Sequence, residues 1–99
     1  MNINKFSEGK HIIDFSASWC KPCKQVAPFF EQYSQQFNTI IFHKIDIDDE
    51  PEITNDFGVD ILPTFIAIVD GEEIARYSGP NQTILLKLIN QLADYSSLN

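Results

Sequence analysis

The sequence predicts an α/β domain in which a mixed four-stranded sheet carries helices on both faces. Four short runs of apolar, β-branched and aromatic residues have the composition of buried strands. Apolar residues at helical spacing follow the first run and again follow the last. The expected order is strand, helix, strand, helix, strand, strand, helix. We expect residues 1–99 to form one domain, because this is an ordinary domain length and we find no linker or repeat.

The first half predicts a strand, a helix and a second strand. The strands are residues 11–17 (HIIDFSA) and 39–47 (TIIFHKIDI). Residues 24–37 between them place six apolar side chains at helical spacing: Val26, Ala27, Phe29, Phe30, Tyr33 and Phe37. A helix in this position makes the two strands parallel, with a right-handed crossover.

A short helix is expected next, over residues 50–57. Asp49 stands at its N-cap position, and Pro51 is tolerated in the first turn. Gly58 can adopt the left-handed conformation that often ends a helix.

The last part predicts a hairpin and a helix. Residues 64–69 and 74–77 are its strands, and the Asp70-Gly71 pair between them favours a tight turn. Asn81 is expected to cap the last helix. The apolar stripe of that helix consists of Ile84, Leu85, Leu88, Ile89 and Leu92.

Charge and composition exclude several classes of protein. The chain has no apolar run long enough to span a membrane, and Asp14 interrupts the first apolar run, so we expect neither a membrane span nor a signal peptide. An intracellular location is the default expectation. The net charge is −7, and seven of the fourteen acidic residues lie between Asp46 and Asp60. This charge argues against a nucleic-acid partner, and the acidic run is interpreted as a solvated surface.

The two cysteines of the chain lie three positions apart in ASWCKPCK, residues 17–24. They lie between the first predicted strand and the helix that follows it. The N-terminus of that helix carries a partial positive charge, which favours a thiolate on Cys20. Cys23 lies one turn deeper and is expected to be better shielded. We therefore expect Cys20 to be the nucleophile and Cys23 to resolve the mixed disulfide. Pro22 fits the first helical turn, where its missing donor costs nothing.

Three other interpretations compete with dithiol exchange. A zinc site needs four ligands, and only His11 and His43 remain, in strands and without metal-type spacing. A permanent structural disulfide needs an oxidising compartment, which nothing in the sequence supports. Two inert buried thiols would leave Lys21 and Pro22 between them unexplained. No metal is expected.

Asp14 is unusual because it lies in an otherwise apolar strand, six positions before Cys20. Burying a carboxylate is costly unless it is protonated or paired. Either the residue has a chemical role or it forms a structural ion pair at the strand end.

Four stretches together resemble the thioredoxin family: FSASWCKPCK (15–24), HKIDIDD (43–49), ILPTF (61–65) and DGEEIARYSG (70–79). The resemblance covers about residues 12–92 and implies a thioredoxin-like fold. It implies a cytoplasmic, monomeric reductase of protein disulfides that needs no metal or organic cofactor. Its partners would be disulfide-containing proteins and an electron donor of the thioredoxin-reductase type, in keeping with electron transport and cell redox homeostasis.

The resemblance also implies a substrate groove around the cysteines. Trp19 would be an aromatic lid, although a core aromatic is the alternative. Pro63 would follow a cis bond and leave the Leu62 backbone free to pair with an extended segment of the substrate. Gly79 would border the groove, although a turn glycine explains it nearly as well.

For Asp14, the resemblance implies a buried acid that accepts the proton of the resolving cysteine, with Lys44 as its neighbour. Desolvation is expected to raise the pKa of Asp14, and Lys44 to offset part of that rise.

Two features depart from the family pattern. Most thioredoxins begin about a dozen residues earlier, so residues 1–10 are expected to supply only a turn or a short helix. The fold would be N-terminally trimmed, with a less protected sheet edge that favours pairing with another chain. Lys21 also stands where most thioredoxins have glycine, at the rim of the groove, where it could also influence partner choice.

Lys21 bears on the direction of the reaction. Its positive charge favours the thiolate, so we expect a reduction potential above the approximately −270 mV of thioredoxin, reaching about −220 mV. Two alternatives to a reductase stay open. A larger rise in potential would favour a disulfide oxidase or isomerase, and a non-catalytic binding module could use the groove around Trp19 and Pro63.

Overall fold

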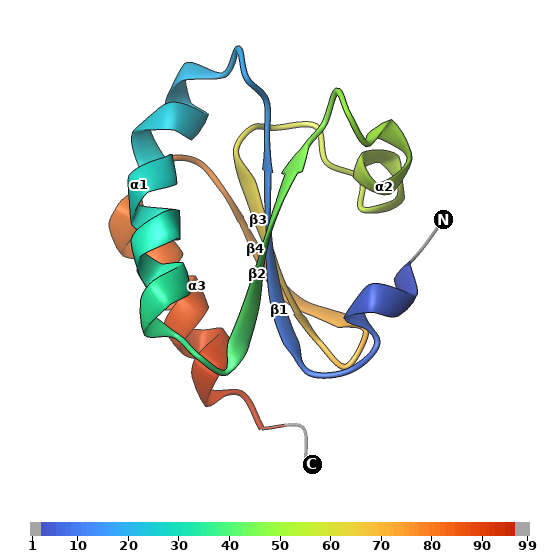
Figure 1. Ribbon diagram of the computed structural model, residues 1–99, viewed down its shortest axis with the longest axis vertical. Coiled ribbons are helices and arrows are strands. Elements are labelled where there is room, and N and C mark those ends of the chain that lie inside the picture. The colour runs from blue at the N-terminus through green and yellow to red at the C-terminus, as the bar shows by residue number, and fades with distance from the viewer. Residues whose placement is uncertain (1–2, 97–99) are drawn as a thin grey trace.

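The computed structural model describes residues 3–96. Its elements, in chain order, are η1 (Ile3–Phe6), β1 (Lys10–Ser16), α1 (Lys21–Gln36), β2 (Ile40–Asp46), α2 (Pro51–Asp56), β3 (Thr64–Val69), β4 (Glu72–Ser78) and α3 (Gln82–Asp94). The four strands form one mixed sheet in the order β2-β1-β3-β4. β1 and β2 are parallel, and the other two pairings are antiparallel. Helices α1 and α3 cover one face, and α2 and η1 lie on the other (Figure 1). The predicted fold class is confirmed.

Successive side chains of β1 point to opposite faces of the sheet, and the core has one layer on each face. Ile12 packs with residues of α1 and α3, including Val26 and Leu85. Ile13 and Phe15 point to the other face, where they pack around η1 and α2. Asp14 therefore faces α1.

The ends of the elements follow the local sequence with one exception. Asn81 caps α3 by accepting a hydrogen bond from the Ile84 amide at 3.0 Å. Gly58 has a φ of 65°, and Asp70 and Gly71 both have positive φ in the hairpin turn, as expected. The predicted cap of α2 was wrong.

The N-cap of α2 is Glu50 instead of Asp49, and no side chain caps the helix. Pro51 begins α2 one residue after the cap. Asp49 instead donates its backbone N–H to the carbonyl of Asp46, within the turn that leaves β2. The connection is closed by these backbone hydrogen bonds and by the Asp46 carboxylate, which accepts from the Asp48 amide at 2.8 Å.

The described part of the N-terminal segment is the short helix that was expected. η1 is a single turn of 3-10 helix, and its Phe6 is buried under the sheet. No strand pairs with the outer side of β2 among residues 3–96, so β2 is an edge of the sheet. In the same part of the chain, no helix is long and apolar enough to cross a bilayer.

Candidate active site

The two cysteines form a disulfide at the N-terminus of α1. Cys20 is the N-cap residue, and its sulfur accepts a hydrogen bond from the Cys23 amide at 3.2 Å. Both residues are 5% exposed, so burial does not distinguish them, and the expectation that Cys23 is better shielded was wrong. Their difference lies in their place in the helix, because the Cys20 sulfur stands at its N-terminus and accepts from the Cys23 amide. Pro22 lies in that turn.

Asp14 is buried on the α1 side of β1, with 2% of its surface exposed. Its Oδ1 has no hydrogen-bond partner among the described residues. Burial raises the pKa of Asp14 to about 6, although the positive charge of Lys44 acts in the opposite direction. Lys44 stands beside it in the β1–β2 register, but residues 3–96 contain no ion pair between the two. The raised pKa was predicted correctly, and a structural ion pair is not found.

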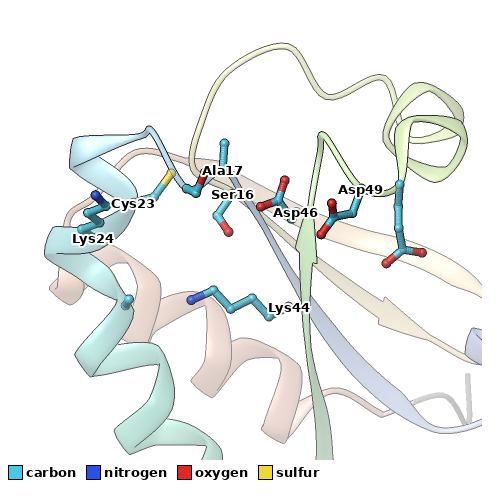
Figure 2. A pocket seen from close by; sticks show the side chains of 10 residues that line it. Ser16, Ala17, Cys23, Lys24, Lys44, Asp46 and Asp49 are labelled. Atoms are coloured by element: carbon cyan, nitrogen blue, oxygen red, sulfur yellow. The ribbon is translucent and has the colours of Figure 1, made fainter.

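An open cavity of about 670 Å³ lies between α1 and the C-terminal end of β2. Its walls are Ser16, Ala17, Ser18, Cys23, Lys24, Ala27, Lys44, Asp46, Asp49 and Glu50. Figure 2 shows the Lys44 side chain extending across the cavity toward α1, where Cys23 and Lys24 lie. Lys44 thus connects the neighbourhood of Asp14 with a cavity that reaches Cys23.

Trp19 is 67% exposed beside the disulfide, which excludes the alternative of a core aromatic. Its indole N–H donates to Oδ2 of Asp48 at 2.9 Å. This hydrogen bond fixes one edge of the ring while the faces stay accessible. The role of Asp48 was missed, because in the sequence it is one acid in an acidic run.

The loop before β3 and the loop after β4 meet at one place. The Leu62–Pro63 bond is cis, as the resemblance implied, and the Pro63 carbonyl accepts a hydrogen bond from the Gly79 amide at 2.9 Å. Gly79 has a φ of 141°, and a Cβ there would lie 2.6 Å from the Tyr77 hydroxyl. The positive φ favours glycine, and a larger residue would also have to displace the Tyr77 ring. The Tyr77 hydroxyl also accepts from the Asn81 amide at 2.9 Å, a contact that sequence reasoning missed.

Leu62 connects this loop pair with the disulfide. It packs against the small cluster formed by Ala17, Cys20 and Cys23. Lys21 begins α1 with its side chain exposed. The structure thus brings the predicted cysteines and the predicted groove residue Leu62 together, with the Pro63–Gly79 contact in the adjoining loops.

A metal site has no support in the described residues, which contain no cluster of three or more histidine, cysteine or acidic side chains. His11 and His43, the remaining candidates in the sequence, form a hydrogen bond of 2.9 Å with each other. Nothing in the sequence pattern of either strand signals this contact.

The site can be compared with known proteins. The thioredoxin family model matches residues 1–91. Rabbit (Oryctolagus cuniculus) thioredoxin is 40% identical over 81 residues, which are 82% of this chain and 77% of the relative. The solved structure of Fasciola hepatica thioredoxin has a TM-score of 0.85 and 36% identity, covering 91% of this chain and 86% of that one.

A third similar protein is a chain in a structure that describes thiol resolving in a yeast mitochondrial 1-Cys peroxiredoxin by the glutathione and thioredoxin systems. It has a TM-score of 0.87 and 35% identity, covering 91% of this chain and 86% of that one. The family match spans most of the chain and includes both cysteines. The chain belongs to the thioredoxin family.

Proposed function

We propose a mechanism for the thiol–disulfide oxidoreductase activity that membership of this family gives the chain: it reduces protein disulfides through Cys20 and Cys23. The observation that carries the proposal is the Cys20–Cys23 disulfide at a helix N-terminus, on the same side of the sheet as a buried, unpartnered carboxyl group. A structural crosslink has no need of such a group.

The reaction takes place in two exchanges. The Cys20 thiolate attacks one sulfur of the substrate disulfide, which forms a mixed disulfide and releases the other substrate sulfur as a thiolate. Cys23 then loses its proton and attacks the Cys20 sulfur. The Cys20–Cys23 disulfide forms, and the second substrate sulfur leaves as a thiolate that takes up a proton. Two electrons have passed from the protein to the substrate.

Asp14 is the proposed acceptor of the Cys23 proton. A pKa of about 6 leaves the carboxyl group mostly ionised at pH 7, yet far closer to the pKa of a thiol than an exposed aspartate. Its Oδ1 has no other hydrogen bond to break. Lys44 limits the rise in pKa and lines the cavity that Cys23 borders, so we assign it a supporting role in proton release.

Substrate proteins would bind at the groove around the cysteines. An extended segment can pair with the Leu62 backbone while Trp19 covers it and Gly79 allows its close approach. Lys21 and Pro22 would form the rim on the helix side. The exposure of Trp19 and the hydrogen bond that holds Gly79 beside Pro63 support this placement.

The proposal extends to partners and location. Electrons would come from a reductase of the thioredoxin-reductase type, and substrates would include thiol proteins such as peroxiredoxins, the class named in one similar structure. We infer a cytoplasmic, single-domain protein over residues 1–99 that needs no metal or organic cofactor. One chain supplies every residue of the mechanism, so the catalytic unit is a monomer.

A second candidate, oxidation or isomerisation of disulfides, is favoured by the exposed positive charge of Lys21 next to Cys20. This charge stabilises the reduced form and raises the potential. At the distance of a neighbouring exposed side chain the effect is modest, so we assign the reductase function first.

The test is reduction of insulin disulfides by dithiothreitol with catalytic amounts of the protein. The wild type is expected to accelerate the reaction, and Cys20→Ser to abolish the acceleration. Cys23→Ser is expected to accumulate a mixed disulfide with the substrate, because the resolving thiol is absent. A Cys20→Ser variant that retained the wild-type rate would refute the mechanism and favour a binding module.

A further inference from the structure

The outer side of β2 is an open backbone edge. β2 pairs with β1 on one side, and no described strand lies on its other side (Figure 1). Its Ile41 is 56% exposed. Open strand edges of this kind are templates for pairing with another strand.

The register shows which backbone groups point outward. Ser16 is aligned with Asp46, and the Ile47 amide donates to the Ser16 carbonyl at 2.9 Å. In a parallel pair, alternate residues direct both backbone groups to the same side. Odd-numbered residues of β2 therefore face β1, and the even-numbered residues 40–46 face the open edge.

Two of these outward-facing backbone groups already form hydrogen bonds within the chain. The Ile40 amide donates to the Phe37 carbonyl at 3.4 Å. The Asp46 carbonyl accepts from the amides of Asp49 and Glu50, both at 3.0 Å. Three N–H groups, on residues 42, 44 and 46, and three carbonyls, on residues 40, 42 and 44, have no partner within residues 3–96.

This set of groups is complementary to itself. When a second copy lies antiparallel with the two-fold axis at His43, residue 42 pairs with residue 44 of the copy, and residue 40 pairs with residue 46. In each chain, the N–H of residue 42 then donates to the carbonyl of residue 44 in the copy. The N–H of residue 44 donates to the carbonyl of 42, and the N–H of 46 to the carbonyl of 40. The three open donors of one chain thus meet the three open acceptors of the other. The two used groups, N–H of 40 and C=O of 46, fall opposite each other. A two-fold axis at 42 or at 44 would bring fewer open donors opposite open acceptors.

The charge distribution favours the same orientation. The acidic segment from Asp46 to Glu50 lies at the C-terminal end of β2, and residues 36–40 at the other end carry no charge. Antiparallel pairing places each acidic segment beside an uncharged segment of the second copy. Parallel pairing would bring the two acidic segments together in a chain that already has a net charge of −7.

The pairing would also cover an exposed apolar side chain of the edge. Ile41 would lie opposite Ile45 of the second copy and bury part of its exposed surface. Lys44 points across the cavity toward α1, on one face of the sheet (Figure 2). We propose that β2 is a self-association surface, through which two copies of the chain form a two-fold dimer with a continuous sheet. The contact is a single strand edge, so the dimer is weak and forms above the concentrations at which one chain acts alone.

Lys44→Pro tests the backbone edge by sedimentation velocity under reducing conditions. Proline removes an outward N–H, which an edge strand tolerates, and so leaves the β1 ladder intact. The wild type is expected to shift from the mass of one chain toward that of two as the concentration rises to about 1 mM, and Lys44→Pro to stay monomeric. Lys44→Ala is the matched control, because it keeps the N–H and should associate as the wild type does. A wild type that stays monomeric over this range, or a Lys44→Pro variant that still dimerises, would overturn the proposal.

Crosslinking tests the register independently, in a Cys20→Ser, Cys23→Ser background. His43→Cys places two thiols opposite each other at the axis, at a Cα separation of about 4.5 Å that a disulfide can bridge. Ile41→Cys places its two Cα atoms four residues apart along the strands, about 13 Å, which a disulfide cannot span. Oxidation is expected to link His43→Cys efficiently and Ile41→Cys poorly. Equal or reversed yields in folded variants, checked by circular dichroism, would refute the register.

Discussion

Of the three buried polar side chains of β1, His11 and Asp14 face opposite sides of the sheet and differ in their hydrogen bonding. His11 is 3% exposed and Asp14 is 2% exposed. Both ring nitrogens of His11 have partners: the Glu8 carbonyl at 2.8 Å and the His43 ring at 2.9 Å. Oδ1 of Asp14 has none among the described residues. We interpret His11 as a polar group that stabilises the fold and Asp14 as the group that our proposal assigns to the reaction.

The histidine pair has a definite arrangement of protons. The Glu8 carbonyl can only accept, so Nε2 of His11 is the donor to it, and we assign Nδ1 as the acceptor of the His43 N–H. The ring of Phe6 meets both imidazoles edge-on, with centroids 5.5 and 5.0 Å away. Burial lowers the pKa of His43 to about 4, with smaller contributions from the positive charges of His11 and Lys5. His43 is therefore neutral at pH 7, and both ring nitrogens of His11 have hydrogen-bond partners.

Asp14, unlike the histidine pair, is buried with an oxygen that has no hydrogen-bond partner among the described residues. Its buried carboxylate is ionised at neutral pH against the cost of desolvation, and the pKa of about 6 records that cost. A residue that lowers stability and has an open oxygen is a candidate for function. The comparison predicts that changes at Asp14 affect the reaction and that changes at the histidine pair affect stability alone.

The largest effect is expected from Asp14→Asn on the resolving step. The variant keeps the shape of the side chain but loses the base, so release of the substrate from the mixed disulfide should slow by about 10² to 10⁴-fold at pH 7. Stopped-flow or acid-quench measurement of the mixed disulfide gives this rate. The wild-type rate should rise through about pH 6, and the variant should lose this inflection. An unchanged rate and pH profile would show that Asp14 is not the acceptor.

The same variant should be more stable than the wild type at neutral pH. The folded-state pKa of Asp14 is about 6 and the unfolded value is 3.8, so its favourable contribution is present below pH 3.8 and is lost as the pH rises through 6. This loss amounts to about 3 kcal/mol above pH 7. Urea unfolding of the oxidised proteins from pH 3 to pH 8 should show a stability difference that grows by this amount. A difference independent of pH would contradict the burial argument.

His43→Leu should lower stability by about 1 to 3 kcal/mol at pH 7 and leave the rate of disulfide reduction unchanged, because it removes the partner of the buried His11 Nδ1. His43→Gln is the matched control, since its amide N–H can replace the lost donor and recover part of the stability. The folded-state pKa of His43 lies below the unfolded value of 6.5, so its contribution is present above pH 6.5 and lost as the pH falls through about 4. Both variants should lose this dependence. A large loss of activity would assign the pair a role in the reaction.

The smallest effect is expected at Lys21, which is exposed, unlike the two buried groups. Lys21→Gly should make the reduction potential more negative by on the order of 10 to 50 mV, because the Cys20 thiolate loses a nearby positive charge. Lys21→Arg keeps the charge and should keep the potential. An unchanged potential in Lys21→Gly would leave partner choice as the role of this residue.

Most of the fold was predictable because its signals are local. The apolar runs, the Asp70-Gly71 turn and the Asn81 cap act within a few residues, and the structure confirms each. Asp14 could be singled out as well, since a carboxyl group in an apolar strand is visible in the sequence alone.

The missed contacts depend on register and on distant loops. The His11–His43 hydrogen bond requires two strands to align so that both rings face one side. The Trp19–Asp48 bond joins loops 29 residues apart. The error over the α2 cap has the same origin, because backbone hydrogen bonds from the preceding turn determined where that helix begins.

A redox titration of the Cys20–Cys23 pair tests the central claim most directly. Glutathione and dithiothreitol buffers would set the potential, and the fluorescence of Trp19, which lies beside the disulfide, would report the transition. We expect a two-electron transition between about −270 and −220 mV, which would establish a reductant. A transition at about −180 mV or above would contradict the reductase assignment and favour an oxidase or isomerase.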